Sequence, residues 1–229
     1  MHNLLELAKN SNIDRLIQTS TSEVYGTAQF IPMSEKHPIN PQSPYAATKA
    51  SADHLCMSYY YSFGLPVTIL RPFNTYGPRQ STRAVIPTII NQISKKVKKV
   101  KLGSINTTRD FNFVEDTVQA YVKSLNINKK LDGQIINVGS NFEVSIKDIY
   151  KIVCQYYDRY PKIQIDRKRF RPSKSEVKRL YSCNKKAIKL LKWKPKFSGK
   201  NNFYKGIYKT CDWFENNKKD SDRKSTRLN

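Results

Sequence analysis

The six residues RLIQTS at positions 15–20 decide the fold, together with a helix and a second strand that follow them. Their short apolar centre is typical of a buried strand. A helix is predicted at 46–63, with Gly64 as its C-cap. The second strand, PVTILR at 66–71, stops at Pro72 because proline cannot donate to a strand ladder. A strand, a helix and a strand in this order predict one parallel βαβ crossover.

The rest of the chain continues this alternation, which is typical of an α/β fold with a parallel sheet. A first helix is expected at 1–10, and a helix interrupted near Pro87 is expected at 82–95. Asp116 lies early in a later helix, where its charge suits the helix dipole. Ser145 caps the last predicted helix. The remaining elements are strands at 98–102, 109–114 and 134–138 and helices at 115–125 and 145–156.

The 229 residues carry a formal net charge of +23, which is unevenly distributed. Residues 1–92 contain 7 basic and 5 acidic side chains, a net of +2, so residues 93–229 carry +21. Such asymmetry suits a polyanion partner and keeps a basic nucleic-acid-binding module as an alternative function. The other interpretation is that the lysines lie on solvated surfaces. No apolar run is long enough for a membrane helix and no signal sequence is present, so a cytoplasmic protein is expected.

Glycine, cysteine and histidine are too dispersed to form a binding motif. No two of the 8 glycines are closer than six residues, which excludes a GxGxxG or GxxxxGK phosphate-binding turn within these residues. The 4 cysteines show no CxxC spacing and the 3 histidines are scattered. Reduced thiols and no metal site are therefore expected.

The strongest local motif is YAATK, in which Tyr45 and Lys49 lie one helical turn apart on the same face. An ammonium group near a phenol favours the phenolate, and such a tyrosine can take a proton from a sugar hydroxyl. The lysine can hold the ribose hydroxyls of a nicotinamide cofactor. The alternative is a chance surface pair, since tyrosine and lysine are abundant here.

The segment TSTSEVYG at 19–26 follows the first strand directly. Ligands bind at the carboxyl ends of strands in open α/β sheets. There a hydroxyl such as Thr21 or Ser22 can orient a substrate, and the Glu23 carboxylate can remove a carbon-bound proton. A helix cap or a serine/threonine turn is the structural alternative.

Three further residues suit a phosphorylated ligand. Asn74 follows the second strand in a loop shaped by prolines and Gly77, and its amide offers both a donor and an acceptor. Arg109 heads a later strand and Arg171 lies in the basic segment FRPSKSEV, so the two arginines can clamp a diphosphate. The alternative is that each arginine is simply solvated.

Together these motifs resemble the extended short-chain dehydrogenase/reductases, the NAD-dependent epimerases and dehydratases that act on nucleotide sugars. The resemblance covers about residues 1–216 in the family's order, and it is closest to the bacterial dehydratases of nucleotide-linked N-acetylglucosamine. It implies that Tyr45 is the base at the sugar 4-hydroxyl, that Lys49 holds the nicotinamide ribose, that Thr21 bonds the 4-oxygen and that Glu23 takes the carbon-5 proton. It also implies that Ser22 belongs to the catalytic residues. Tyr45 and Lys49 would bind the cofactor together with Pro72. The implied substrate-binding residues are Asn74, Arg109 and Arg171.

The sequence departs from the family at two places. Ser22 stands where the hexose dehydratases have an aspartate that protonates the leaving hydroxyl, which keeps a 4-epimerase and a UDP-glucuronate decarboxylase as alternatives. The glycine-rich turn is absent, and a βαβ unit takes about 30 residues or more. We therefore expect that about 100 residues of a longer protein precede Met1, and that the 229 residues alone lack activity.

The resemblance also implies an organisation for the chain. Residues 1–140 correspond to the C-terminal portion of a doubly wound, Rossmann-type NAD-binding domain, and 141–216 to a smaller α/β substrate-binding lobe. Residues 217–229 contain one apolar residue and are expected to be a disordered tail. A homodimer formed through two helices, one of them bearing Tyr45, is the implied assembly.

Overall fold

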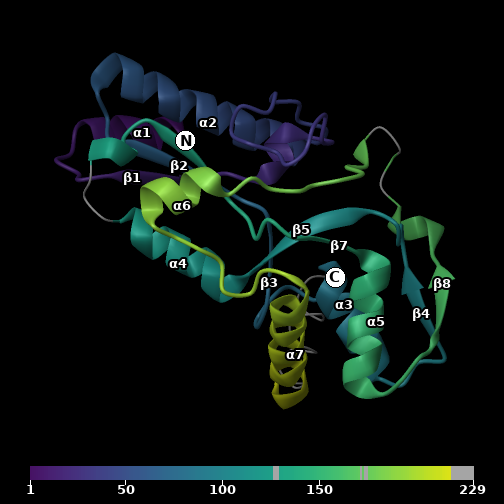
Figure 1. The fold of residues 1–229 in the computed structure, drawn as a ribbon. Coiled ribbons are helices and arrows are strands. Elements are labelled where there is room, and N and C mark those ends of the chain that lie inside the picture. Colours follow the sequence, from purple (N-terminus) through teal and green to yellow (C-terminus); the bar gives the residue numbers. More distant parts are fainter. Residues whose placement is uncertain (126–128, 171, 173–174, 218–229) are drawn as a thin grey trace.

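The computed structural model describes residues 1–125, 129–170, 172 and 175–217 (Figure 1). It has the α/β fold with parallel strands that the sequence predicts. Within the described ranges, no helix is both long and apolar enough to cross a membrane.

The first sheet contains the predicted crossover. Strand β1 (Leu16–Thr19), helix α2 (Pro44–Phe63) and strand β2 (Val67–Pro72) follow one another, and β2 also pairs with β6 (Gln134–Val138). The strand order is β1-β2-β6 and both pairings are parallel. All three strands therefore present their carboxyl ends to the same edge of the sheet, where a ligand site is expected.

Helices cover both faces of this sheet, as Figure 1 shows. On one face, α1 (His2–Lys9) and α2 pack on Val67 and Ile69 of β2. On the other face, α4 (Val114–Ser124) and α6 (Lys185–Leu191) pack with Leu70. The central strand is thus buried on both sides, which is typical of a parallel sheet in an α/β domain.

A second packed region lies beside this sheet. Its largest fully buried side chains are aromatic, Tyr76, Phe113 and Phe203, and they lie in one apolar cluster. Strand β5 (Thr108–Phe113) pairs in parallel with β3 (Asn74–Tyr76) and antiparallel with β7 (Glu143–Ser145), and β4 (Lys99–Leu102) pairs in parallel with β8 (Lys162–Ile165). The helices are α3 (Val85–Ser94), α5 (Ile146–Tyr157) and α7 (Lys200–Asn216), and the short 3-10 helices of the chain are η1 (Ser22–Tyr25), η2 (Lys129–Leu131) and η3 (Arg167–Arg169).

The structure corrects one predicted helix. Helix α3 begins at Val85 rather than at residue 82, so Pro87 lies in its first turn and does not interrupt it. Proline is tolerated there because the first N–H groups of a helix have no intrahelical partner. The strands β3, β7 and β8 and the helices α6 and α7 were not predicted at all.

The two packed regions are interleaved along the sequence. The aromatic cluster takes residues from 76–113 and from 142–214, while α6 packs on the first sheet. The boundary between 1–140 and 141–216 stays a prediction. Of the expected tail 217–229, only Asn217 lies within the described residues, where it ends α7.

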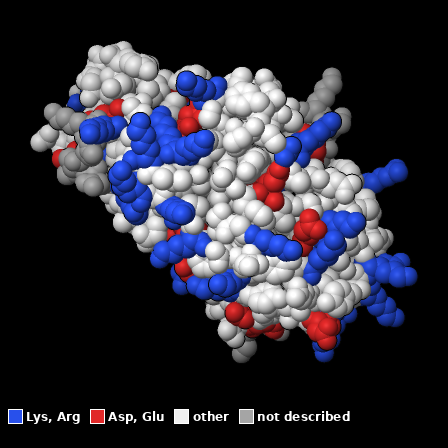
Figure 2. Space-filling view, viewed as in Figure 1, with Lys and Arg blue, Asp and Glu red and all other residues white. Residues whose placement is uncertain are grey.

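Figure 2 shows how charge is distributed on one face of the molecule. Lysine and arginine side chains are spread over this face, and they gather most densely in the region of α6 and α4. Acidic side chains lie among them. The basic surplus on this face therefore resembles a solvated surface more than one continuous nucleic-acid groove.

Candidate active site

The segment after β1 forms a tight 3-10 turn at the carboxyl edge of the sheet. Thr21 has extended backbone angles and caps η1, because its hydroxyl oxygen accepts from the Glu23 backbone N–H at 3.2 Å. The Thr21 hydroxyl proton can still be donated to a ligand. Ser22 is buried and Glu23 is half-buried. The predicted cap is thus present, and the Thr21 side chain that forms it can also bind a substrate.

Helix α2 brings Tyr45 and Lys49 to the same edge. The helix starts sharply because Ser43 accepts from the Ala46 backbone N–H and Pro44 fills the first turn. Lys49 Nζ donates to the backbone carbonyl of Thr19, the last residue of β1, at 2.8 Å. Tyr45 is 52% exposed, so its phenol is open to a ligand.

A second tyrosine lies near this end of β1. Burial raises the pKa of Tyr121, on α4, the Thr19 side chain opposes that effect, and the nearby Tyr45 adds to it. Helices from both faces of the sheet therefore contribute a phenol beside the strand end. Tyr121 was not singled out from the sequence, where it stands among ordinary apolar positions of a helix.

A buried polar network lies beneath the candidate catalytic segment. Asp53, on α2, forms an ion pair with Arg71, at the end of β2, with 2.9 Å between Nη2 and Oδ2. The Ser20 hydroxyl donates to the same carboxylate oxygen at 2.8 Å. Arg71 also donates to the Tyr25 phenol at 3.0 Å, and that phenol donates to Asn137 of β6 at 2.7 Å.

This network joins every element that carries the candidate catalytic residues. Asp53 lies one turn beyond Lys49 on α2, while Ser20 and Tyr25 flank Thr21, Ser22 and Glu23 on both sides. Burial raises the pKa of Asp53, and Arg71 opposes that effect. The ion pair is nearly inaccessible, so it fixes the helix relative to the strand ends with little screening by solvent.

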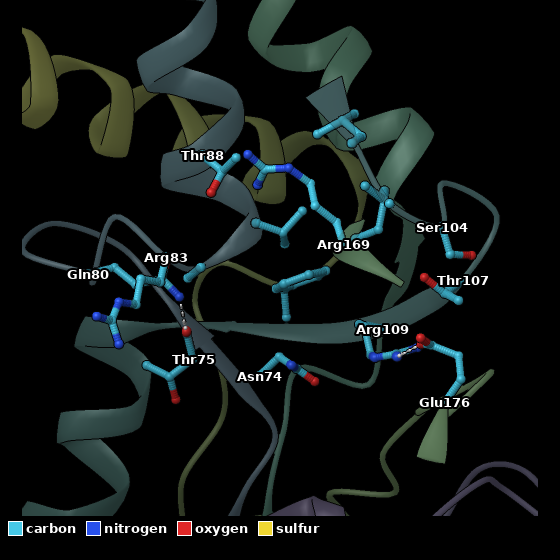
Figure 3. A pocket seen from close by; sticks show the side chains of 16 residues that line it. Asn74, Thr75, Gln80, Arg83, Thr88, Ser104, Thr107, Arg109, Arg169 and Glu176 are labelled. Atoms are coloured by element: carbon cyan, nitrogen blue, oxygen red, sulfur yellow. Dashed lines mark hydrogen bonds and ion pairs between the residues drawn. The ribbon is translucent and has the colours of Figure 1, made fainter. Parts of the chain in front are cut away.

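A separate cavity of about 400 Å³ opens two residues beyond Pro72, the last residue of β2. Asn74 lies at its floor and Arg109 at its side (Figure 3). The carbonyl oxygens of the Asn74 and Gln80 side chains are buried without a hydrogen-bond partner among the described residues. Buried acceptors of this kind are costly unless a ligand or water donates to them.

Arg109 is held firmly at this cavity. It donates to the backbone carbonyls of Thr108, at 2.9 Å, and Lys178, at 3.3 Å, and its Nη2 lies 3.3 Å from the Glu176 carboxylate. The structure thus brings Asn74 and Arg109, predicted from positions 35 residues apart, to one cavity. The third predicted substrate residue, Arg171, lies outside the described residues.

Several cavity residues were missed by the sequence reasoning. Two of them, Gln80 and Arg83, follow the loop that carries Asn74, and Glu176 lies in the segment that was singled out for Arg171. Their closeness in the sequence to Asn74 and Arg171 was the signal that could have identified them. Arg169 and Thr88 carried no signal, since one is a basic residue among many and the other lies on a helix face.

Comparison with known proteins decides the family. A family model described as GDP-mannose 4,6 dehydratase matches residues 1–205. The chain belongs to this family of NAD-dependent epimerases and dehydratases. It is similar to the human dTDP-D-glucose 4,6-dehydratase, with 32% identity over 94% of this chain and 61% of the relative.

Two solved structures are similar in fold. The UDP-glucuronic acid 4-epimerase of Bacillus cereus, in complex with UDP-glucuronic acid and NAD, matches with a TM-score of 0.84 and 30% identity, over 93% of this chain and 65% of that one. The dTDP-glucose 4,6-dehydratase of Bacillus anthracis, in complex with NAD, matches with 0.83 and 29%, over 95% and 67%. The chain therefore spans about two thirds of the length of these proteins.

The comparisons correct one narrower expectation. The relatives just described are named for dTDP-glucose and UDP-glucuronic acid, so the matches do not single out a branch specific for N-acetylglucosamine. They support the wider family resemblance. They do not test the individual site residues, which stay predictions.

Proposed function

We propose that this protein is a nucleotide-sugar 4,6-dehydratase that uses NAD. The observation that carries the proposal is the 2.8 Å bond from Lys49 to the Thr19 carbonyl. It ties the helix bearing Tyr45 to the strand that leads into Thr21 and Glu23. Two motifs 20 residues apart therefore serve one edge of the sheet, as the family chemistry requires.

Tyr45 acts as the base at the sugar 4-hydroxyl. Its phenol is half exposed at the strand end, and Lys49 lies one turn further along the same helix. The Thr21 hydroxyl donates to the 4-oxygen and holds it in place. Loss of the 4-hydroxyl proton to Tyr45 starts the formation of the 4-keto group.

Glu23 acts next. A ketone at carbon 4 acidifies the proton on carbon 5, and the Glu23 carboxylate accepts that proton. The hydroxyl on carbon 6 then takes the proton that Glu23 has accepted and leaves as water. Ser22 occupies the position where a carboxylic acid would protonate the leaving group, so we expect this step to be the slow one.

The described residues fit the nicotinamide end of NAD. Lys49 and Tyr45 project from one face of α2 at the strand end, and Pro72 ends the neighbouring strand. Lys49 and Tyr45 would hold the nicotinamide ribose. When bound, NAD supplies a hydride acceptor at carbon 4 and a hydride donor at carbon 6.

The cavity beside Asn74 and Arg109 binds the nucleotide diphosphate. The Arg109 guanidinium suits a phosphate oxygen, and the Asn74 amide can both donate and accept. The unpartnered Asn74 carbonyl oxygen requires a donor, which the hydroxyls of a ribose or a sugar supply.

Product analysis tests the reaction. The full-length protein that contains these residues is incubated with NAD and, in separate reactions, dTDP-glucose, UDP-N-acetylglucosamine and UDP-glucuronic acid, and the masses of the products are measured by mass spectrometry. A dehydratase product is lighter by one water. Tyr45→Phe should abolish turnover because the base is lost, while Tyr61→Phe, an exposed tyrosine on the same helix, should retain it. A Tyr45→Phe enzyme with near-normal kcat contradicts the assigned base.

A 4-epimerase is the second candidate. Ser22 favours it because no carboxylic acid stands beside Glu23. An epimerase needs only the oxidation at carbon 4 and the return of the hydride to the opposite face of the same carbon, with no leaving group. The Bacillus cereus structure described above is a 4-epimerase of similar fold. Its product would have an unchanged mass and an inverted carbon 4, while a decarboxylase product would have lost carbon dioxide.

A further inference from the structure

Two basic segments that are far apart in the sequence form one small sheet. Residues 95–101, KKVKKVK, contain five lysines and no acidic residue, and residues 159–168 contain four basic residues and one acidic residue. The parallel pairing of β4 with β8 brings these segments together, with Lys99 opposite Lys162 and Lys101 opposite Gln164. Figure 1 shows the two strands at one margin of the molecule, with β8 outside β4, and basic side chains project from the same margin in Figure 2.

The lysines of the two strands share the solvent face of this sheet. Side chains alternate between the two faces of a strand, and Val100 and Leu102 are buried while Lys99 and Lys101 are exposed. Lys162, opposite Lys99, is exposed as well. Like charges on opposite residues of neighbouring strands repel each other. No ion pair joins these three lysines to an acidic side chain in the described part of the chain, so the face carries a positive charge that is not neutralised there.

The outer edge of β4 is closed by a side chain. Gln92, on α3, accepts from the Lys101 backbone N–H at 2.8 Å and donates to the Lys101 carbonyl at 3.2 Å. One amide group thus makes both of the hydrogen bonds that a neighbouring strand would make with this residue. No strand can be added on this side without displacing Gln92.

The outer edge of β8 is open. The Asp166 N–H donates to the Leu102 carbonyl at 2.8 Å, and in a parallel ladder this means that the even-numbered residues of β8 bond β4. The backbone N–H and C=O groups of Ile163 and Ile165 therefore point away from β4. Among the described strands β8 pairs with β4 alone, and Ile165 is 48% exposed. These groups are available to a further strand.

We propose that the open edge of β8 binds an extended acidic segment of another protein as an additional strand. Its backbone bonds Ile163 and Ile165, and its acidic side chains lie on the same face as Lys162, with Lys99 one strand further away. Side chains on one face of a strand repeat about every 7 Å, so acidic residues at alternate positions match this face. The surface uses none of the residues assigned to the nucleotide-sugar reaction.

Two other occupants fit this edge less well. A second copy of this chain would bring lysines against lysines, and edge lysines discourage such pairing. A single-stranded nucleic acid needs aromatic side chains on which its bases stack, and the solvent face presents only lysines and Gln164. Charge and backbone together therefore favour an acidic strand.

Peptide binding by the full-length protein that contains these residues tests the proposal. The probe is a short, fluorescently labelled peptide of alternating glutamate and valine, and fluorescence anisotropy at 0.15 M salt measures its affinity. The double variant Lys99→Gln with Lys162→Gln should weaken binding by about tenfold, as expected for two lost ion pairs at a surface. Lys147→Gln with Lys189→Gln is the matched control, since it removes two exposed lysines from α5 and α6 and should leave the affinity unchanged.

A second measurement distinguishes strand addition from charge attraction alone. Two further peptides carry N-methyl groups, one on the glutamate amides and the other on the valine amides, so that their charges are the same. Only one alternate set of amides faces β8, so one methylated peptide should lose binding and the other should keep it. Hydrogen exchange at the Ile163 and Ile165 amides should slow when the unmethylated peptide binds.

Each outcome decides the proposal. Weaker binding by the lysine double variant, together with slower exchange at Ile163 and Ile165, supports it. If both methylated peptides bind like the parent peptide, or exchange at these amides is unchanged, strand addition is wrong. The proposal is also wrong if the parent peptide does not bind, or if a single-stranded RNA oligonucleotide of equal charge binds more tightly. The mass measurement of reaction products tests the proposed function separately.

Discussion

At the scale of single residues, the candidate site depends on groups that never touch a substrate. Asp53 and Arg71 are buried together, and their bonds reach Ser20 and Tyr25 on either side of the Thr21–Glu23 segment. A buried charge is tolerated only when a partner and further hydrogen bonds compensate its lost hydration. The pair therefore makes the position of α2 relative to β1 sensitive to one side chain.

Asp53→Asn should destabilise the protein strongly. It leaves the Arg71 guanidinium buried without a counter-charge, which typically costs about 3 kcal/mol or more in the free energy of unfolding. Urea denaturation at pH 7 measures the change. Asp14→Asn is the control, because the same substitution at an exposed site should change stability by less than about 0.5 kcal/mol.

A double variant distinguishes charge from packing. Asp53→Leu with Arg71→Met removes both charges and should recover much of the stability lost by Asp53→Asn. If Asp53→Asn is as stable as the unaltered protein, the ion pair does not hold these elements together.

At the scale of elements, the helices that could be predicted are those whose first and last residues form recognisable caps. Helix α2 has Ser43 and Pro44 at its start and Gly64 in the left-handed conformation at its end. Ser145 likewise caps α5 by accepting from the Asp148 N–H. Such caps act locally, so a single sequence reveals them.

Other elements could not be predicted because tertiary contacts define them. Asp116 lies in the first turn of α4, as predicted, and its carboxylate also accepts from the backbone N–H groups of Lys196 and Phe197, about 80 residues away, which the sequence did not reveal. That contact fixes the segment between α6 and α7. The strands β3 and β7 have three residues each, which is too short for a periodic pattern. The lining of the cavity was hard to predict for the same reason. Arg169 lies there because β4 pairs with β8, and the sequence does not reveal that pairing.

The short strand β7 gives a pH-dependent prediction. Its Glu143 carboxylate accepts from Thr108 at 2.9 Å and from Arg179 at 2.8 Å, and the Arg179 bond lowers the pKa of Glu143 below its usual 4.5. A carboxyl pKa that is lower in the folded state adds stability above the unfolded-state pKa. That stability is lost as the pH falls through the folded-state value.

Glu143→Gln should therefore lower the free energy of unfolding by about 0.5 to 1 kcal/mol at pH 7, the range for a solvent-screened pair. The difference from the unaltered protein should shrink as the pH falls below about 4, where both chains lack the charge. Urea denaturation at pH 7 and pH 3.5 measures it. Glu115→Gln, an exposed glutamate 3.7 Å from Lys209, should show little difference at either pH. If the free energy of unfolding of Glu143→Gln differs from that of the unaltered protein by the same amount at both pH values, the assigned charge effect is wrong.

At the scale of the whole molecule, the two packed regions meet around the candidate site. Strand β2 of the first sheet ends at Pro72, and β3 begins at Asn74. The carboxyl edge with the proposed catalytic residues and the cavity therefore lie next to each other along the chain. The segment near 180 returns between them, since Leu180 N–H donates to Thr108 and Cys183 N–H donates to Met33. A substrate that spans both parts would have its sugar near Tyr45 and its diphosphate near Arg109.

Helices α1 and α2 carry a group of exposed apolar side chains. Helices α1 and α2 are in contact, and their outer faces expose Leu4, Leu7 and Leu55. Exposed apolar side chains grouped on neighbouring helices mark association surfaces. We propose that these helices form the homodimer interface that the family resemblance implies.

Leu7→Glu should convert the dimer to a monomer, because a carboxylate would be desolvated at the centre of the interface. Sedimentation equilibrium measures the mass in solution. Leu125→Glu is the control: its leucine is as exposed, 63% against 66% for Leu7, but it lies at the end of α4 on the opposite face of the sheet. A dimer that survives Leu7→Glu and dissociates with Leu125→Glu would move the interface to α4. A monomeric unaltered protein would mean that α1 and α2 do not associate in this chain, and that their leucines need another explanation.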